Sequence, residues 1–205
     1  MKKKGEVDPA SGTRRSFLQQ LSVAGIAVVL SDSAVAETET AKGSPAKFKI
    51  LDGKTRIDIG GRGKEIIEAA YKLGHEYEGK HRGCCRCTVA ALQHAIEFVP
   101  NDEDLFRTSC CLDGGATPTG VASCGGFTGS GIIIGYLCGT NPFGNTGLSH
   151  KLIHQVYKKY KEAYGSVLCK DARKKAKGDC PKVVGSAAMW TTEIILRQFT
   201  NYIPR

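Results

Sequence analysis

The spacing of apolar residues constrains the fold of this chain more than any other feature of the sequence. Apolar side chains recur every three or four positions from residue 64 to the C-terminal region. The clearest stripe repeats every four residues over 148–164, which places its side chains on one face of an α-helix. This stripe comprises Leu148, Leu152, Val156, Tyr160 and Tyr164. A chain of 205 residues is long enough to bury such faces in one core.

The same spacing predicts several further helices. We expect helices over about 64–79, 85–99, 102–112, 131–139, 146–164 and 181–199, with a short helix carrying Cys169. About six helices with little sheet predict an all-α fold, namely a small helical bundle.

Glycine and proline predict where these helices begin and end. Gly74 or Gly79 could end the first helix, and Pro100 should stop the second. Pro181 should open the last helix, with Cys180 as its N-cap, because proline favours the first helical position.

The first 36 residues resemble a twin-arginine export signal. Lysines at the start are followed by Arg14 and Arg15, an apolar stretch over 21–30, and an Ala-x-Ala cleavage site ending at Ala36. The apolar stretch is too short to span a bilayer, so we expect no stable membrane span after cleavage. The domains are then an export signal at 1–36, a linker and extended arm (or short hairpin) at 37–63, and a helical cysteine-rich domain at 64–205.

The export signal and the net charge indicate where the protein acts and which partners it could have. The signal predicts a periplasmic or otherwise exported protein, and a route that carries folded proteins favours a metal cofactor, although disulfides are an alternative outside the cytoplasm. The net charge of +9 favours an acidic partner, and the sequence allows a homodimer. Basic repeats with interleaved aromatic residues are absent from the sequence, so nucleic acid is not an expected partner.

Four of the nine cysteines lie at or near predicted helix ends, among small residues. They are Cys87, Cys124, Cys169 and Cys180. A helix start offers unpaired N–H groups and the positive end of the dipole, which favour the thiolate that binds metal. The glycines after Cys124 would let a bulky group approach the backbone. The alternative is a glycine-rich turn with an inert cysteine.

The segment Cys124–Gly129 resembles the central motif of the C_GCAxxG_C_C family of redox-active proteins, with Gly126 in place of alanine. The family's first cysteine begins a helix, and its last two form a close pair after an amphipathic helix. The resemblance covers about 64–200 and extends to the cysteine domain of split-Soret cytochromes c. It implies that Cys87, Cys124, Cys169 and Cys180 hold an iron–sulfur cluster in an electron-transfer protein.

The remaining cysteines leave alternatives open. Cys84 or Cys85 could replace Cys87 as a ligand, since both lie within one turn of it. Covalent haem is not expected, because Thr88 follows the C-x-x-C of residues 84–87 where attachment needs histidine. Cys138 fits a small core side chain.

A second cysteine pair could serve other chemistry. Cys110 and Cys111 could bind another metal, form disulfides or act as a thiol–disulfide enzyme. A zinc- or disulfide-stabilised structural domain is a further alternative. His94, His150 and His154 are expected to be solvated or hydrogen-bonded rather than metal ligands.

A basic run separates the last two proposed ligands. It contains Lys170, Arg173, Lys174, Lys175 and Lys177. The run could be a solvated face or a docking site for an acidic redox partner protein beside the cluster.

Overall fold

The computed structural model describes residues 48–140 and 143–204. Its described part contains seven helices and only isolated β-bridges, which confirms the predicted all-α fold. They are α2 (Gly63–His81), α3 (Cys84–Ala95), α4 (Glu103–Thr108), α5 (Gly125–Cys138), α6 (Gly147–Tyr164), α7 (Cys169–Lys175) and α8 (Cys180–Phe199). The predicted export signal lies outside the described residues.

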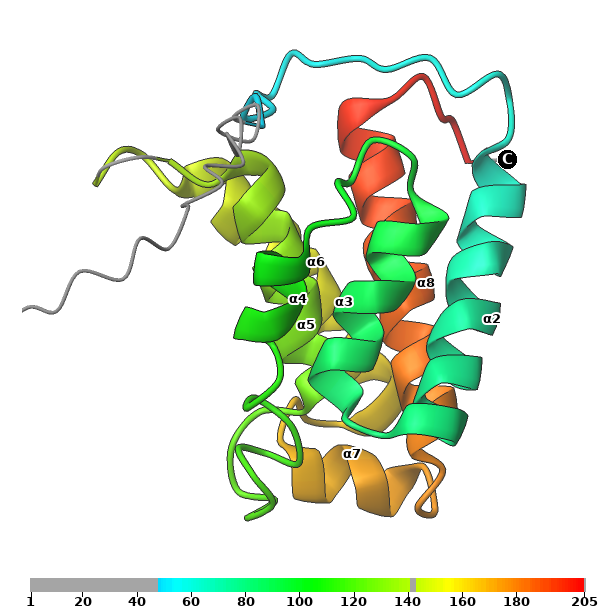
Figure 1. The fold of residues 1–205 in the computed structure, drawn as a ribbon, viewed down its shortest axis with the longest axis vertical. Coiled ribbons are helices and arrows are strands. Elements are labelled where there is room, and N and C mark those ends of the chain that lie inside the picture. Colours follow the sequence, from blue (N-terminus) through cyan, green and yellow to red (C-terminus); the bar gives the residue numbers. More distant parts are fainter. Residues whose placement is uncertain (1–47, 141–142, 205) are drawn as a thin grey trace, which may run out of the picture. The chain divides into compact units, whose positions relative to one another are not determined.

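Helix α8 is the centre of the bundle. It packs along α2 and also contacts α3, α5, α6 and α7. Figure 1 shows α2, α3 and α8 running side by side, with α7 lying across one end of the bundle. The inner face of α8 is fully buried at Val184, Ala187 and Ile195, so the core lies between this helix and its neighbours.

Glycines permit close approach between α2 and α8. A Cβ at Gly74 would lie 3.1 Å from the Val184 carbonyl oxygen, and one at Gly185 would lie 2.9 Å from the Tyr71 carbonyl oxygen. The prediction that Gly74 or Gly79 ends the first helix is therefore wrong: α2 continues to His81, because packing against α8 favours the helix through both glycines.

Four other predicted boundaries are wrong. Helix α4 ends at Thr108 rather than near Leu112. Helix α3 ends at Ala95 rather than at Pro100, where the Gln93 amide instead donates to the Pro100 carbonyl at 3.0 Å and ties the following loop to α3. Helix α5 begins at Gly125, so the glycine-rich segment is itself helical. The N-cap of α8 is Asp179, whose carboxylate accepts the Lys182 N–H at 3.0 Å.

The segment before α2 forms the predicted extended arm rather than a hairpin. Its Leu51 N–H donates to the Leu137 carbonyl at 2.8 Å, and its Ile57 N–H donates to the Phe199 carbonyl at 2.7 Å. Ile57 forms a parallel bridge with Thr200, so the arm pairs with the chain end after α8. Among the described residues, no helix has both the length and the apolar character needed to cross a membrane.

Enlarging Gly74 tests the contact between α2 and α8. We expect Gly74→Leu to lower the free energy of unfolding by about 1–3 kcal/mol, because the new side chain would push α2 away from α8. Gly79→Leu is the matched control, since a Cβ there would lie 4.0 Å from its nearest neighbour, Pro181. Urea unfolding curves measure both variants, and equal losses would contradict this description of the interface.

Candidate functional site

Four helices begin at the same end of the bundle, and each begins at a cysteine. Cys84, Cys169 and Cys180 are the first residues of α3, α7 and α8, and Cys124 is the N-cap of α5. Figure 1 shows α7 across this end, beside the starts of α3 and α8. Helix N-termini concentrate positive partial charge and unpaired N–H groups, so this end of the molecule favours a negative group.

Backbone pairing brings Cys124 and Cys169 together. Ser123 and Leu168 form an antiparallel bridge. On either side of it, the Cys124 N–H donates to the Val167 carbonyl at 2.8 Å and the Cys169 N–H donates to the Ala122 carbonyl at 2.9 Å. Side chains two positions apart on such segments share a face, so the two thiols project from the same face of the bridge.

Cys84 connects electrostatically to each of the other three thiols. The Cys124 thiol donates a hydrogen bond to the Cys84 sulfur, which lowers the pKa of Cys84 and raises that of Cys124. Burial raises the pKa of Cys169, and the neighbouring Cys84 raises it further. Burial also raises the pKa of Cys180, followed by the effects of Glu78 and Cys84. Cys84 is therefore within electrostatic range of Cys124, Cys169 and Cys180.

Tyr160 supports the Cys124 sulfur from the core. Its fully buried hydroxyl donates to Cys124 Sγ at 3.7 Å, and this hydrogen bond favours the thiolate. A Cβ at Gly126 would overlap the same hydroxyl, so the glycine leaves room for it.

The glycines after Cys124 allow α5 to approach the start of α3. A Cβ at Gly125 would overlap the Cys84 sulfur, and one at Gly129 would lie 2.7 Å from the Cys85 carbonyl oxygen. A third glycine, Gly115, has a φ of 64°, and its Cβ would lie 2.6 Å from Cys169 Cβ. In this structure the close neighbours of the glycines are thus the cysteine-bearing turns themselves.

The structure places Cys87 apart from the other three sequence-predicted ligands. Its Sγ donates to the Arg82 carbonyl oxygen at 3.3 Å, and the Glu78 carboxylate lies close enough to shift its pKa. Burial, followed by the charge of Glu78, raises the pKa of Cys87 to about 12. Of the alternatives that the sequence left open, Cys84 rather than Cys87 is the one close to Cys124, Cys169 and Cys180.

Other candidate residues have distinct environments. Cys138 is buried in the core and donates to the Ile134 carbonyl at 3.2 Å, as expected for a core side chain. Cys110 and Cys111 follow α4 and are exposed. His94 Nδ1 lies 2.8 Å from the Tyr77 hydroxyl, as expected for a hydrogen-bonded histidine.

Two further histidines were considered as metal ligands in the sequence. His150 and His154 are exposed on α6. Within the described ranges, no three His, Cys, Asp or Glu side chains are already gathered as a site for one metal ion.

Comparison with known families matches residues 82–194, more than half of the chain, to the family described as "Putative redox-active protein (C_GCAxxG_C_C)". The chain belongs to this family. No curated protein and no solved structure matches it. The resemblance inferred from the motif at Cys124 is confirmed, and the matched range contains all four cysteines that begin helices at the shared end of the bundle.

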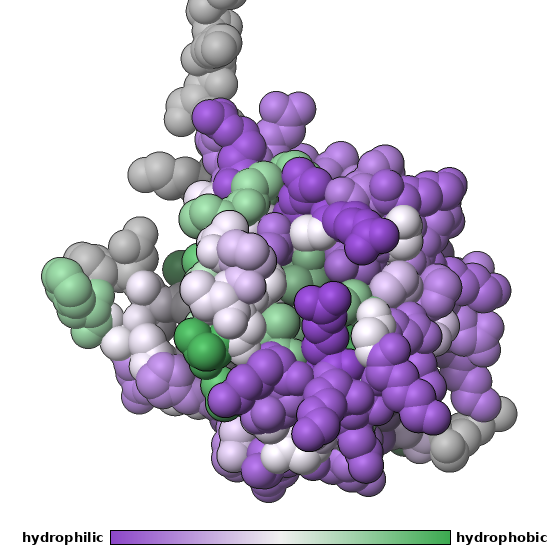
Figure 2. All heavy atoms as spheres, turned by 90° about the horizontal axis from the view of Figure 1, so that it is seen from below, coloured by the Kyte–Doolittle hydropathy of each residue, from purple (hydrophilic) through white to green (hydrophobic). Residues whose placement is uncertain are grey.

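In this family member, basic residues lie beside Cys169. A pocket of about 510 Å³ is lined by Cys169 together with Lys170, Arg173, Lys174 and Lys177 of the α7 region. Figure 2 views this end of the bundle from below and shows hydrophilic residues over most of the face, around a recess with apolar residues. The basic run thus lies directly beside a proposed ligand.

Glu78 is a buried acid that the sequence analysis missed. It is 8% exposed, and its Oε2 has no hydrogen-bond partner. Burial raises its pKa. A sequence signal existed, because Glu78 continues the four-residue spacing of Ile66, Ala70 and Gly74 along the buried face of α2.

Replacing Glu78 should change how stability depends on pH. A raised folded-state pKa means that the contribution of Glu78 to stability is fully present below its unfolded pKa and declines as pH rises through the folded pKa. Between about pH 5 and about pH 8, the free energy of unfolding should therefore fall less for Glu78→Gln than for wild type. Urea unfolding at the two pH values measures this difference.

Glu76→Gln is a control of opposite sign. The hydrogen bond from Lys80 lowers the pKa of Glu76, so this carboxylate stabilises the protein above its unfolded pKa. The Glu76→Gln variant should therefore lose at least as much stability as wild type when the pH is raised. Identical pH profiles for Glu78→Gln and wild type would contradict a raised pKa at Glu78.

Proposed function

We propose that this protein is an exported redox protein that holds an iron–sulfur cluster through Cys84, Cys124, Cys169 and Cys180. The observation that carries the proposal is the start of four helices at these four cysteines, at one end of the bundle. Family membership supports the redox role, and the sequence of residues 1–36 supports export by the twin-arginine route.

The chemistry of the donor set fits such a cluster. Iron–sulfur clusters are held by cysteine thiolates, and N–H groups near the sulfurs tune them. Cys84 has a lowered pKa, and the Gly114 N–H and the Cys124 thiol both donate to its sulfur. The starts of α3, α5, α7 and α8 add positive partial charge that offsets the negative charge of four thiolates.

The ligand assignment replaces Cys87 by Cys84. Both lie in the first turn of α3, but Cys84 contacts Cys124 whereas Cys87 interacts with Glu78 and Arg82. To hold a shared group, the four thiols would turn about their single χ1 bonds toward one another. When bound, the cluster would take up and release single electrons.

The assignment is tested by anaerobic purification followed by iron, acid-labile sulfide and zinc analysis. We expect wild type to contain iron and sulfide, with visible absorbance that Cys84→Ser and Cys124→Ser remove. Cys138→Ser and Cys87→Ser should retain the absorbance, because neither side chain belongs to the proposed set.

Three results would contradict parts of the proposal. Loss of iron in Cys87→Ser with retention in Cys84→Ser would restore Cys87 as the ligand. Colourless protein with stoichiometric zinc would indicate a structural metal domain. Disulfide-reductase activity that depends on Cys110 and Cys111, with no metal bound, would indicate a thiol–disulfide enzyme.

The basic pocket supports an acidic protein as the electron-transfer partner. Its positive side chains come from α7 and the turn after it, and the pocket includes the Cys169 ligand itself. A partner that docks there would lie next to the cluster, and positive charge at such a surface speeds association with acidic proteins.

Charge reversal at this pocket should change reaction rates with small oxidants. We expect the double variant Lys174→Glu/Lys177→Glu to be oxidised more slowly by anionic ferricyanide and faster by cationic hexaammineruthenium(III), with differences that shrink as salt increases. Lys151→Glu is the control, because this exposed lysine lies near the start of α6 and does not line the basic pocket. Stopped-flow absorbance measures the rates, and equal effects from both variants would argue against local steering.

A further inference from the structure

A separate cavity of about 460 Å³ lies between α2, α3 and α4. It is lined by Tyr77, His81, Arg86, Cys87, Ala90, His94 and Phe106. This volume is within the range of cavities that bind small molecules. Neither the family description nor the proposed ligand set assigns a role to this cavity.

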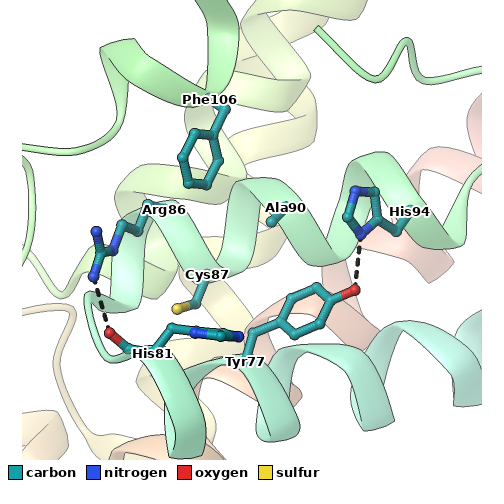
Figure 3. Close-up of a pocket in the computed structure, with 7 residues that line it drawn as sticks. All are labelled: Tyr77, His81, Arg86, Cys87, Ala90, His94 and Phe106. Carbon is teal, nitrogen blue, oxygen red and sulfur yellow. Dashed lines mark hydrogen bonds between the residues drawn. The ribbon is translucent and has the colours of Figure 1, made fainter. Parts of the chain in front are cut away.

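The cavity has the shape of a slot with aromatic walls. Figure 3 shows the Phe106 ring of α4 on one side and the Tyr77 and His81 rings of α2 on the other. Cys87 and Ala90 of α3 lie between them and form the floor. The Tyr77 hydroxyl is fixed by its 2.8 Å hydrogen bond to His94. Two aromatic walls from different helices favour a flat ring as the occupant.

One end of the slot carries a fixed positive charge. The Arg86 Nε donates to the Arg82 carbonyl at 3.0 Å, and Arg86 Nη2 donates to the His81 carbonyl at 2.9 Å. These bonds hold the guanidinium without neutralising it, and Arg86 forms no ion pair within the described part of the chain. A ligand with an anionic group would supply the missing partner.

The floor of the slot is close to the proposed cluster. Cys87 lies three residues after Cys84 on α3, a rise of about 4.5 Å along the helix. Both cysteines pack against Val184 in one buried group with Tyr77. A ring in the slot would thus be separated from a cluster ligand by less than one helical turn.

We propose that this cavity binds a planar aromatic anion, and that its natural ligand is a redox-active ring of the quinone class. The ring lies between Phe106 and Tyr77, and its anionic group faces Arg86. The redox part of this inference rests on the proposed function, whereas the binding part does not.

Binding of 9,10-anthraquinone-2-sulfonate to the mature protein tests the proposal. This probe is flat and anionic, and its fused rings leave no open quinone edge for cysteine addition. We expect saturable binding by isothermal titration calorimetry, weakened at least about tenfold by Ala90→Phe, because the new ring fills the slot. Ala163→Phe on α6 is the matched control with unchanged affinity, since both alanines are half-buried and neither packs against the core.

A second variant tests the anionic group. Arg86→Gln should weaken the sulfonate about tenfold while leaving neutral 2-(hydroxymethyl)anthraquinone unaffected. No saturable binding to wild type, or equal binding to wild type and Ala90→Phe, would overturn the proposal. Equal weakening of both probes by Arg86→Gln would overturn the anionic ligand class.

The test is independent of the cluster. Cys124→Ser removes a proposed ligand at the start of α5 but leaves every residue of the slot in place. Retained probe binding in this variant would support the slot whether or not the wild type contains iron. Iron without probe binding would retain the proposed function and overturn this inference.

Discussion

The contact between the first turns of α3 and α5 determines which cysteine of α3 lies against the start of α5. Gly125 and Gly129 have no side chain on the face of α5 that touches α3, so the Cys84 sulfur and the Cys85 carbonyl can lie against the helix. A larger residue at Gly125 would occupy the position of the Cys84 sulfur. The proposed site depends on this contact, because Cys84 is within electrostatic range of Cys124, Cys169 and Cys180 and raises the pKa of each.

Four helix N-termini at one end of a small bundle create a positive electrostatic potential there. Their unpaired N–H groups and aligned dipoles favour negative charge, and the α7 lysines add full positive charges nearby. Protonated thiols supply little negative charge there. The interaction with Cys84, followed by burial, keeps the pKa of Cys124 high, and burial raises the pKa of Cys169 and Cys180. A group that binds thiolates would place the negative charge where the fold favours it. This physical argument links the fold to the proposed iron–sulfur cluster.

The two cysteines Cys84 and Cys87, in the first turn of α3, would then have different roles. Cys84 lies beside Cys124 at the start of α5, whereas Cys87 lies beside Glu78 and lines the aromatic slot. One turn of helix thereby separates a proposed metal ligand from a proposed small-molecule site. A protein partner at the α7 surface and a small ligand in the slot would approach the cluster from different elements of the bundle.

The sequence alone predicted most of the helices and three of the four cysteines that lie at helix starts. Apolar spacing predicted the all-α bundle, and Gly165 ends α6 as expected because its φ of 74° suits glycine. The motif at Cys124 identified the family, and the positions of Cys169 and Cys180 at helix starts followed from local pattern. These features are local, so spacing and residue type suffice to predict them.

Only the tertiary structure decided which residues face each other. Cys84 and Cys87 are three positions apart, and helical spacing gives no reason to prefer one, whereas packing of α3 against α5 and α2 separates them. Gly74 was predicted to end a helix but instead lies in the α2–α8 interface, because contacts with a distant helix outweigh its low helix propensity. The burial of Glu78 and the slot beside Cys87 likewise depend on neighbours far away in the sequence.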